Sequence, residues 1–492
     1  MKVDRMRIWN RGRLSRFVCA LASFLGMASL PAGVSLPPIF SDHMVLQKGG
    51  DIPVWGSAEP GQKVVVSLDG RSAEAQADVN GRWEVRLDLR DSSPGPFEMV
   101  VEAGQKIVIQ DVVIGEVWLA AGQSNMAYGL EKSTGAAAEI AASADPMLRE
   151  FKVVQQASPY PATEARGKWM AASPHTAGKF SAVGYYFGKT LRRELGRPVG
   201  IINASMSSTP IESWMSGEAL DGDAELKATK DRHWAMREGA VPEGVRKPIP
   251  SHLAASLFHG MLHPLIPYGI RGFLWNQGEA NAKRGWQYRT AFVQMIGDWR
   301  RKWGRGELPF YFCQTANFSA PAKSPGESDW AELRDAQASA LALPATGMAV
   351  LIDTEPGGDL HPPNKKDAGE RLAFLALAGD YGKSVAASGP VLRKASVEKG
   401  AMRLGFDHAE GLVLRDACPS FAICGADRQW VWAEARVEGG DVVVSAHGVS
   451  EPTAVRYAWS DNPAATLFNA AGLPAAPFRT DDFPAVSLKR KY

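Results

Sequence analysis

Short runs of alternating apolar and polar residues fill the chain from Val34 to about Val113. Among them are "KVVVSLDG", "GRWEVRLDL" and "FEMVVEAGQKIVIQDVVIG", and Gly or Pro interrupts the pattern about every eight to twelve positions. Alternation with a period of two places every second side chain on one buried face of a strand. Residues 34–113 are therefore predicted to form an N-terminal β-sandwich domain.

After Ile114 the pattern changes to fully apolar runs that alternate with helical stretches. The runs are "EVWLAAG", "VGIINAS", "GFLWNQG", "FYFCQTA" and "MAVLID", and the helical stretches include "AVGYYFGKTLRREL" and "WQYRTAFVQMIGDWRRKW". Such alternation predicts βα units around a mainly parallel sheet over residues 114–385. Ligands of these sheets normally bind at the carboxyl ends of the strands.

Beyond residue 385 strand-like segments return, for example "WVWAEARVEGGDVVVSA" and "AVRYAWS". Residues 386–492 are predicted to form a C-terminal β region. The fold class is therefore α/β, with a parallel-sheet domain flanked by β-sandwich regions.

The first 33 residues have a different composition from the rest. Six Lys and Arg residues precede the apolar run from Phe17 to Leu30, which is the pattern of a secretory signal peptide. Ser, Gly and Pro interrupt this run, and it is short for a membrane span, so an uncleaved anchor is the less favoured alternative. We expect cleavage between Ala28 and Ala32 and a secreted or periplasmic protein.

Charge and cysteine content restrict the possible partners. The 55 basic and 53 acidic residues leave a net charge of +2, and charges of one sign do not form long runs. The sequence therefore indicates no strong positive potential that would attract nucleic acid or an anionic membrane. Small neutral or singly charged substrates fit better. No Cys/His spacing matches a zinc site, while Cys418 and Cys424 are close enough in sequence for a local disulfide.

Ser124 follows the apolar run "VWLAA" through Gly122, and the residues after it can open a helix. A hydroxyl at the carboxyl end of a strand, near backbone N–H groups, suits a nucleophile whose oxyanion those groups hold. The stretch departs from the G-x-S-x-G elbow because Met126 occupies the second position after the serine. Turn formation by "GQSN" is the alternative explanation.

A base for such a hydroxyl is offered by "DLHPPNK", residues 359–365. His361 stands before a predicted helix with Asn364 as N-cap and Asp367 three residues later. Asp359 lies two positions before His361, so in an extended segment its carboxylate can hold the Nδ1–H of the ring. A plain surface turn is the alternative, and Asp353 and Glu355 are further candidate carboxylates.

Two more strand ends carry polar residues. "FLWNQGEANA" brings Gln277, Glu279 and Asn281 after an apolar strand, where side-chain amides can donate to an oxyanion or cap the next helix. In "GIINASMSSTPIESW" the strand ends in small residues, and their backbone N–H groups can donate hydrogen bonds to the same oxyanion.

These four blocks, in this order, resemble the sialate O-acetylesterase family of SGNH-type hydrolases. The resemblance extends to "FSDHMVLQKGGDIPVWGSAEPGQKV" and "AVRYAWSDNPAATLFNAAGLPAAPFRTD", and so covers nearly the whole chain after the leader. It implies an SGNH-like catalytic domain and a serine esterase that forms an acetyl-enzyme and needs no cofactor or metal.

The resemblance also assigns roles to residues of this sequence. It makes Ser124 the nucleophile, His361 the general base and Asp359 the orienting acid, although members of the family differ at this third position. Oxyanion donors are the backbone N–H of Ser124 and the amide of Gln277. Ser208 takes the place of a third donor, because Ser207 and Ser208 stand where the family usually has two glycines.

The sugar is expected to contact Asn125, Glu279 and Trp275, and Asn276 replaces an aromatic residue that is common in the family. An O-acetylated sialic acid is the substrate that the resemblance implies, and its carboxylate would call for a cation such as Arg284. Acetylated xylan or another plant polysaccharide, with Trp214, Trp275 or Trp286 stacking on sugar rings, is one alternative. A non-catalytic carbohydrate-binding protein is the other.

Overall fold

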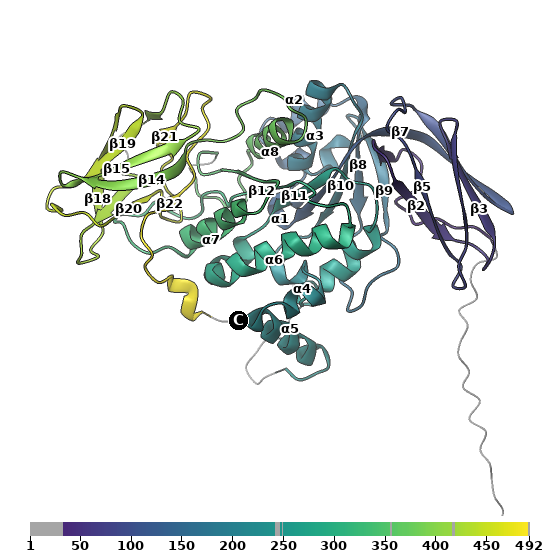
Figure 1. The fold of residues 1–492 in the computed structure, drawn as a ribbon, viewed down its shortest axis with the longest axis horizontal. Coiled ribbons are helices and arrows are strands. Elements are labelled where there is room, and N and C mark those ends of the chain that lie inside the picture. Colours follow the sequence, from purple (N-terminus) through teal and green to yellow (C-terminus); the bar gives the residue numbers. More distant parts are fainter. Residues whose placement is uncertain (1–32, 242–246, 248, 355–356, 416–418, 491–492) are drawn as a thin grey trace, which may run out of the picture.

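The computed structural model describes residues 33–241, 247, 249–354, 357–415 and 419–490. Strands from the N-terminal part lie on one side of a central α/β unit, and a C-terminal β-sheet lies on the opposite side (Figure 1). The predicted signal peptide lies outside the described residues, except for Gly33.

The N-terminal strands form two small antiparallel layers. β3, β4, β6 and the start of β7 form one layer, and β2 pairs with β5 in the other. In β5, buried and exposed side chains alternate strictly, as expected for a strand with one face in a core. The strands are β1 (Val45–Gln47), β2 (Ile52–Ser57), β3 (Lys63–Leu68), β4 (Arg71–Gln76), β5 (Arg82–Leu87), β6 (Phe97–Ala103) and β7 (Gln105–Gly122).

The long strand β7 joins the N-terminal layers to the central sheet. Its residues up to Val112 pair antiparallel with β6, and from Glu116 it pairs in parallel with β10. Its burial changes at the same place, from alternating to continuous. The predicted boundary between residues 113 and 114 thus falls inside one strand, where that strand exchanges partners.

The central sheet has the order β13-β12-β11-β7-β10-β8-β9, and all neighbours are parallel except the edge pair β8 and β9. Strands buried on both faces of a parallel sheet read as continuous apolar runs, which explains the sequence pattern. The further strands are β8 (Asp145–Val153), β9 (Gly167–Ala172), β10 (Val199–Ser205), β11 (Gly272–Asn276), β12 (Phe310–Cys313) and β13 (Thr346–Ala349).

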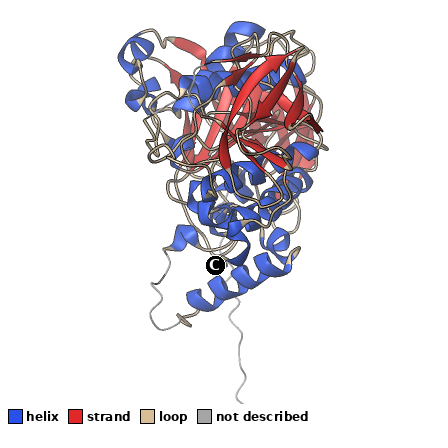
Figure 2. Cartoon of the chain, turned by 90° about the vertical axis from the view of Figure 1, so that its left-hand side faces the viewer, coloured by secondary structure: helices blue, strands red, loops and turns tan. Residues whose placement is uncertain are grey.

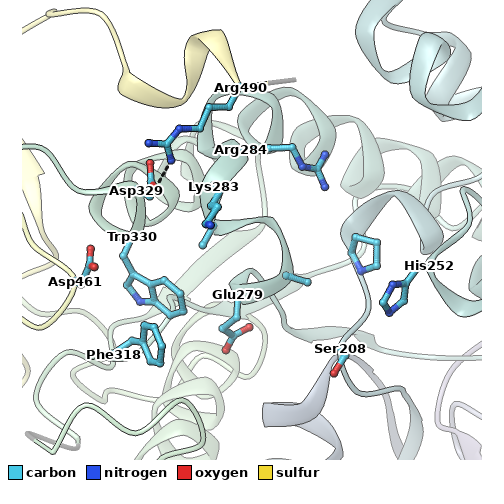
Figure 3. Close-up of a pocket in the computed structure, with 13 residues that line it drawn as sticks. Ser208, His252, Glu279, Lys283, Arg284, Phe318, Asp329, Trp330, Asp461 and Arg490 are labelled. Carbon is cyan, nitrogen blue, oxygen red and sulfur yellow. Dashed lines mark hydrogen bonds and ion pairs between the residues drawn. The ribbon is translucent and has the colours of Figure 1, made fainter. Parts of the chain in front are cut away.

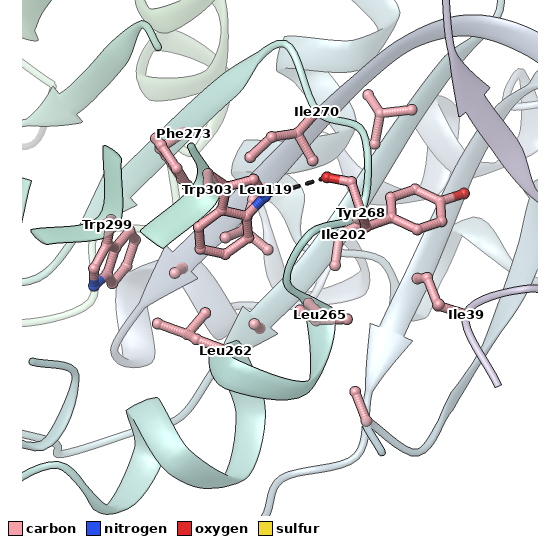
Figure 4. Packing of buried hydrophobic residues seen from close by; sticks show 14 of the residues in the cluster. Ile39, Leu119, Ile202, Leu262, Leu265, Tyr268, Ile270, Phe273, Trp299 and Trp303 are labelled. Carbon is pink, nitrogen blue, oxygen red and sulfur yellow. Dashed lines mark hydrogen bonds between the residues drawn. The ribbon is translucent and has the colours of Figure 1, made fainter. Parts of the chain in front are cut away.

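Helices cover both faces of this sheet. Trp118 and Ala120 of β7 face the core that holds α3 and α8, while Leu119 and Ala121 face the core that holds α6. Figure 4 shows part of the second core, in which Trp299 and Trp303 pack around Phe273. The α-helices are α1 (Ser124–Ala127), α2 (Ala136–Ala141), α3 (Ala182–Leu195), α4 (Gly217–Asp221), α5 (Ala224–Arg237), α6 (Gly285–Trp303), α7 (Asp329–Ala338) and α8 (Lys366–Gly379).

Local signals in the sequence set the helix ends. Ser181 caps α3 by accepting a hydrogen bond from the N–H of Gly184, and Gly196 ends the helix in the left-handed conformation at φ 64°. The short 3₁₀ turns and one π turn are Leu130–Lys132, Ala177–Lys179, Ile211–Ser213, Pro250–His252, Phe258–Leu262 (π), His263–Leu265, Glu279–Arg284, Ser339–Ala342 and Val486–Lys489.

The C-terminal part is an antiparallel sheet in the order β14-β15-β19-β18-β17-β20-β22, with β16 and β21 paired beside it. Figure 2, seen from this side of the molecule, shows its strands at the front. The strands are β14 (Val391–Glu398), β15 (Ala401–Asp407), β16 (Val413–Leu414), β17 (Phe421–Cys424), β18 (Val431–Glu438), β19 (Asp441–Ser445), β20 (Ala454–Tyr457), β21 (Leu467–Phe468) and β22 (Phe478–Arg479).

The α/β class with flanking β regions is confirmed. Cys424 is a buried free thiol, and Cys418, with which a disulfide was considered, lies outside the described residues. None of the helices in the described part of the chain is both long and apolar enough to cross a membrane.

Candidate active site

Three strands of the central sheet end at the same level. Gly122 at the end of β7 pairs with Ser205 of β10 on one side and with Asn276 of β11 on the other. The loops that follow carry the polar blocks "GQSN", "MSSTP" and "NQGEAN". They meet where the chain crosses from one side of β7 to the other, which is the usual binding crevice of such sheets.

Gly122 allows these strands to approach closely. A Cβ atom built on it would lie 2.2 Å from the carbonyl oxygen of Asn276, and its φ of 138° disfavours other residues. The N–H of Gln123 donates to the same carbonyl at 3.0 Å. The turn that presents Ser124 therefore depends on glycine at this position.

Ser124 and His361, which lie 237 positions apart, meet in this crevice. The ring Nε2 of His361 lies 2.8 Å from the Oγ of Ser124, within hydrogen-bond distance. Ser124 is the first residue of α1, and its backbone N–H has no acceptor among the described residues. A hydroxyl beside an imidazole, with a backbone donor at the same residue, is the arrangement that acyl transfer requires.

The short helix after Ser124 is held from behind by the start of α3. Ser181 donates its hydroxyl to the carbonyl of Met126 at 2.7 Å, and its backbone N–H donates to Glu150 at 2.8 Å. Glu150 is fully buried, and burial raises its pKa to about 7.

The loop that carries His361 differs in two details from the expectation. The Oδ1 of Asp359 accepts from the backbone N–H of His361 at 2.9 Å, and no described contact joins Asp359 to Nδ1 of the ring. The N-cap of α8 is Lys365, one residue after the predicted Asn364. Asn364 and Asp367, the second residue of α8, are nevertheless in contact. The amide of Asn364 donates to the carboxylate of Asp367 at 2.8 Å, and its Oδ1 accepts from the N–H of Asp367 at 3.4 Å.

Neither of the two other carboxylates considered as partners of the His361 ring is seen to contact it in the described structure. Both oxygens of Asp353 are bonded by Arg371, at 2.6 and 2.7 Å. Glu355 lies outside the described residues.

Gln277 does not occupy the place of an oxyanion donor. Both hydrogens of its amide are used, one to the carbonyl of Thr209 at 3.1 Å and one to Oδ1 of Asn281 at 2.8 Å. Its side chain is fully buried. The amide is committed to joining the loop after β10 to the loop after β11, because each buried donor needs an acceptor.

Asn125 and Trp275 are also not placed to contact a sugar. Trp275 is completely buried, packs against Trp214 and Trp299, and donates its indole N–H to Tyr288 at 3.3 Å. Asn125 is 5% exposed, and both ends of its amide are hydrogen-bonded within the protein. The sequence pattern could not separate these buried roles from exposed ones.

Ser208 adopts the conformation that a glycine would usually take. Its φ is 61°, in the left-handed region, and the residue is exposed at the edge of the crevice. Its backbone N–H has no acceptor among the described residues. The loop geometry expected for two glycines is therefore reached with serines.

A cavity of about 740 Å³ opens beside the crevice (Figure 3). Glu279 and Ser208 line this cavity, and the rings of Trp330 and Phe318 stack side by side in its wall, with 4.9 Å between the ring centroids. Exposed Lys283 also lines it. The cavity has the size and the mixed aromatic and polar lining of a small-molecule site.

Arg284, suggested for a substrate carboxylate, is paired with the buried carboxylate of Glu212. Burial alone would raise the pKa of Glu212, but Arg284 and Asn281 outweigh it and hold it below its usual value. Trp286 is half exposed and is not among the described residues that line the cavity.

Three residues near the site escaped the sequence analysis: Lys365, Glu212 and His252. Lys365 is 4% exposed, and burial lowers its pKa to about 8. His252 lines the cavity, and burial lowers its pKa as well. For Lys365 and Glu212 the only available signal was adjacency, in "HPPNK" and "TPIESW".

Comparison with known proteins gives a consistent answer. No family model matches the chain. The sialate O-acetylesterase of Mus musculus is 27% identical over 91% of this chain and 94% of its own length, and that of Homo sapiens is 27% identical over 91% and 92%. The crystal structure of a carbohydrate acetylesterase from Xanthomonas citri superposes with a TM-score of 0.83 and 39% identity, covering 92% of this chain and all of that one. The chain therefore belongs to the sialate O-acetylesterase family and is an ester hydrolase.

Proposed function

We propose that this protein hydrolyses O-acetyl esters of carbohydrates through an acetyl-enzyme on Ser124. The observation that carries the proposal is the 2.8 Å distance between Nε2 of His361 and Oγ of Ser124 at the end of the central strand β7. Support for the substrate class comes from relatives named sialate O-acetylesterase and carbohydrate acetylesterase.

In the proposed mechanism, Oγ of Ser124 attacks the ester carbonyl while Nε2 of His361 accepts the hydroxyl proton. The backbone N–H groups of Ser124 and Ser208 donate to the oxyanion, which can contribute about 3 kcal/mol per donor. His361 then gives this proton to the sugar oxygen as its bond to the acyl carbon breaks, so that the sugar leaves as an alcohol. A water molecule, deprotonated by His361, cleaves the acetyl-enzyme and releases acetate.

Asp359 orients the loop of His361 in this proposal through the backbone rather than through the ring. Its carboxylate closes a turn with the N–H of His361.

The test is hydrolysis of p-nitrophenyl acetate by the wild type, Ser124→Ala and His361→Ala, with exposed Ser72→Ala as a matched control. We expect both site variants to lose at least about a thousandfold in kcat while they keep their far-UV circular dichroism. Wild-type turnover by Ser124→Ala would reject the esterase mechanism and favour a carbohydrate-binding role.

Sialic acid esters are the proposed substrate, and Lys283 is the residue proposed to meet their carboxylate. Lys283 is exposed and lines the cavity, whereas Arg284 is paired with Glu212. Acetate release should be compared for O-acetylated sialic acid and acetylated xylo-oligosaccharides. Lys283→Met should raise KM several-fold for the sialic acid ester only; an unchanged KM, or faster turnover of the xylo-oligosaccharide, would favour a neutral polysaccharide.

Secretion is proposed from the leader. Edman sequencing of the protein recovered outside the cytosol should begin between residues 29 and 33. A protein that keeps Met1 would contradict cleavage.

A further inference from the structure

A chain of three hydrogen-bonded polar side chains, of which two are buried and the third is half-buried, lies next to the Ser124–His361 pair. The ammonium of Lys365 donates to Oδ1 of Asn125 at 2.6 Å. The amide of Asn125 donates to Oε1 of Glu279 at 2.5 Å and to the carbonyl of Leu360 at 3.1 Å. Asn125 therefore uses both ends of its amide within this group.

The positions of these partners along the chain give the contacts their meaning. Asn125 follows Ser124 directly, and Leu360 directly precedes His361. Lys365 lies in the same segment as His361, four residues further on. Two hydrogen bonds in opposite directions thus join the residue beside the hydroxyl to the segment that carries the imidazole. Because catalysis depends on the distance between these groups, a shift of about 1 Å can cost about a hundredfold in rate.

The surroundings of Lys365 bear on the strength of its hydrogen bond to Asn125. Its ammonium lies 4.7 Å from the centre of the Tyr128 ring, and the charged or titratable groups that face it are Glu279, Asp359 and Cys313. A hydrogen bond from a charged donor is about twice as strong as one between neutral groups. Burying an ammonium is costly, and functional sites are where proteins keep such groups.

The third member, Glu279, has one unbonded oxygen in the described structure. Its Oε2 is buried without a hydrogen-bond partner, and burial raises the pKa of this carboxyl. Glu279 also borders the cavity. The three hydrogen-bonded side chains therefore extend from the N-terminus of α8 to the wall of the cavity.

We propose that Lys365, acting through Asn125, is a positioning residue that holds the hydroxyl of Ser124 and the imidazole of His361 at reacting distance. The proposal rests on the function proposed above. It requires the charged form of Lys365, because the neutral amine makes a weaker bond to Asn125.

The first experiment compares kcat and KM on p-nitrophenyl acetate for Lys365→Met and for Lys366→Met. Lys366 is the exposed neighbour and serves as the matched control. Lys365→Met should lose about a hundredfold in kcat with KM within twofold of the wild type. Lys366→Met should stay within twofold in both. A Lys365→Met variant that keeps more than half of the wild-type kcat overturns the proposal.

A double-variant cycle tests whether Lys365 acts through Asn125. Asn125→Ala should also lower kcat, and the kcat of the double variant should be no lower than that of the less active single variant. Losses that multiply would mean that the two residues act independently, and would overturn the proposed link.

A pH profile gives a test that does not depend on Lys365→Met folding. Since burial lowers the pKa of Lys365 to about 8, the wild-type kcat should fall above pH 8, after subtraction of the rate with Ser124→Ala. In Lys365→Arg this fall should disappear, because arginine stays charged. A flat wild-type profile, or an unchanged fall in Lys365→Arg, rejects the proposal. Activity in Ser124→Ala would instead reject the proposed function itself.

Discussion

Glu150 allows a quantitative test of how much free energy it costs to bury a carboxyl group behind the candidate active site. It lies in β8, is 1% exposed, and accepts hydrogen bonds from the backbone N–H of Ser181 at 2.8 Å and from Asn203 at 3.4 Å. Burial raises the pKa of Glu150 from 4.5 to about 7, and the two hydrogen bonds and Lys152 offset only part of that effect. The replacement Glu150→Gln keeps an oxygen acceptor for Ser181 and removes the charge.

The sign of the effect follows from proton binding. Below pH 4.5 the carboxyl is protonated in both the folded and the unfolded state, so it contributes no pH dependence. Between pH 4.5 and 7 the unfolded chain loses its proton while the folded protein keeps it, so stability falls as pH rises. Above pH 7 the penalty is complete. A pKa difference of about 2.5 corresponds to about 3 kcal/mol.

We therefore expect Glu150→Gln to raise the free energy of unfolding by about 3 kcal/mol at pH 8, and to change it by less than about 1 kcal/mol at pH 4.5. Urea unfolding at pH 4.5, 6, 7 and 8 measures this, with exposed Glu164→Gln as the control. The same effect at every pH would show that folding does not shift the pKa of Glu150, and a loss of stability at pH 8 would show that its carboxylate stabilises the folded protein; either result refutes the reasoning.

Three more predictions concern the turns around the site. Gly122→Ala should destabilise the protein by about 3 kcal/mol or more and abolish esterase activity, because its Cβ would lie 2.2 Å from a backbone oxygen. Its control is Gly61→Ala, between β2 and β3 and away from the site, which at φ 77° with open space around it should cost only about 1 kcal/mol in the same urea titration. Asp359→Asn should lower kcat less than tenfold, since the amide oxygen can still accept from the N–H of His361; a loss as large as that of His361→Ala would assign the carboxylate a direct role. Ser208→Gly should keep kcat within twofold while Ser208→Val lowers it, because valine tolerates a φ of 61° poorly; equal rates would remove the backbone of residue 208 from the site.

Local patterns in the sequence were sufficient to predict the main architecture of the fold. A parallel strand buried on both faces must be apolar throughout, so "VWLAA" and "GIINA" could be recognised as central strands. Polar residues directly after such strands then had to lie at one edge of the sheet. This reasoning, with the family resemblance, placed Ser124 and His361 in one crevice, and the structure brings them to 2.8 Å.

The direction in which each polar side chain points was beyond the reach of the sequence. Gln277, Asn125 and Trp275 have the residue types of donors and sugar platforms, yet packing turns all three inward. Their partners, such as Thr209 for Gln277 and Lys365 for Asn125, come from distant segments whose approach no local pattern records.

By itself the sequence indicated the apolar strands and their alternation with helices, because these depend on periodicity and on residue type. The family resemblance added Ser124 and His361 as the proposed reacting pair. Only the tertiary structure decided which polar groups face the cavity and which are consumed in buried hydrogen bonds, and that the cation bonded to Asn125 is Lys365. The physical reason is that a buried donor or charge is satisfied by whichever groups the fold brings within about 3 Å, and that proximity is a property of the packed chain.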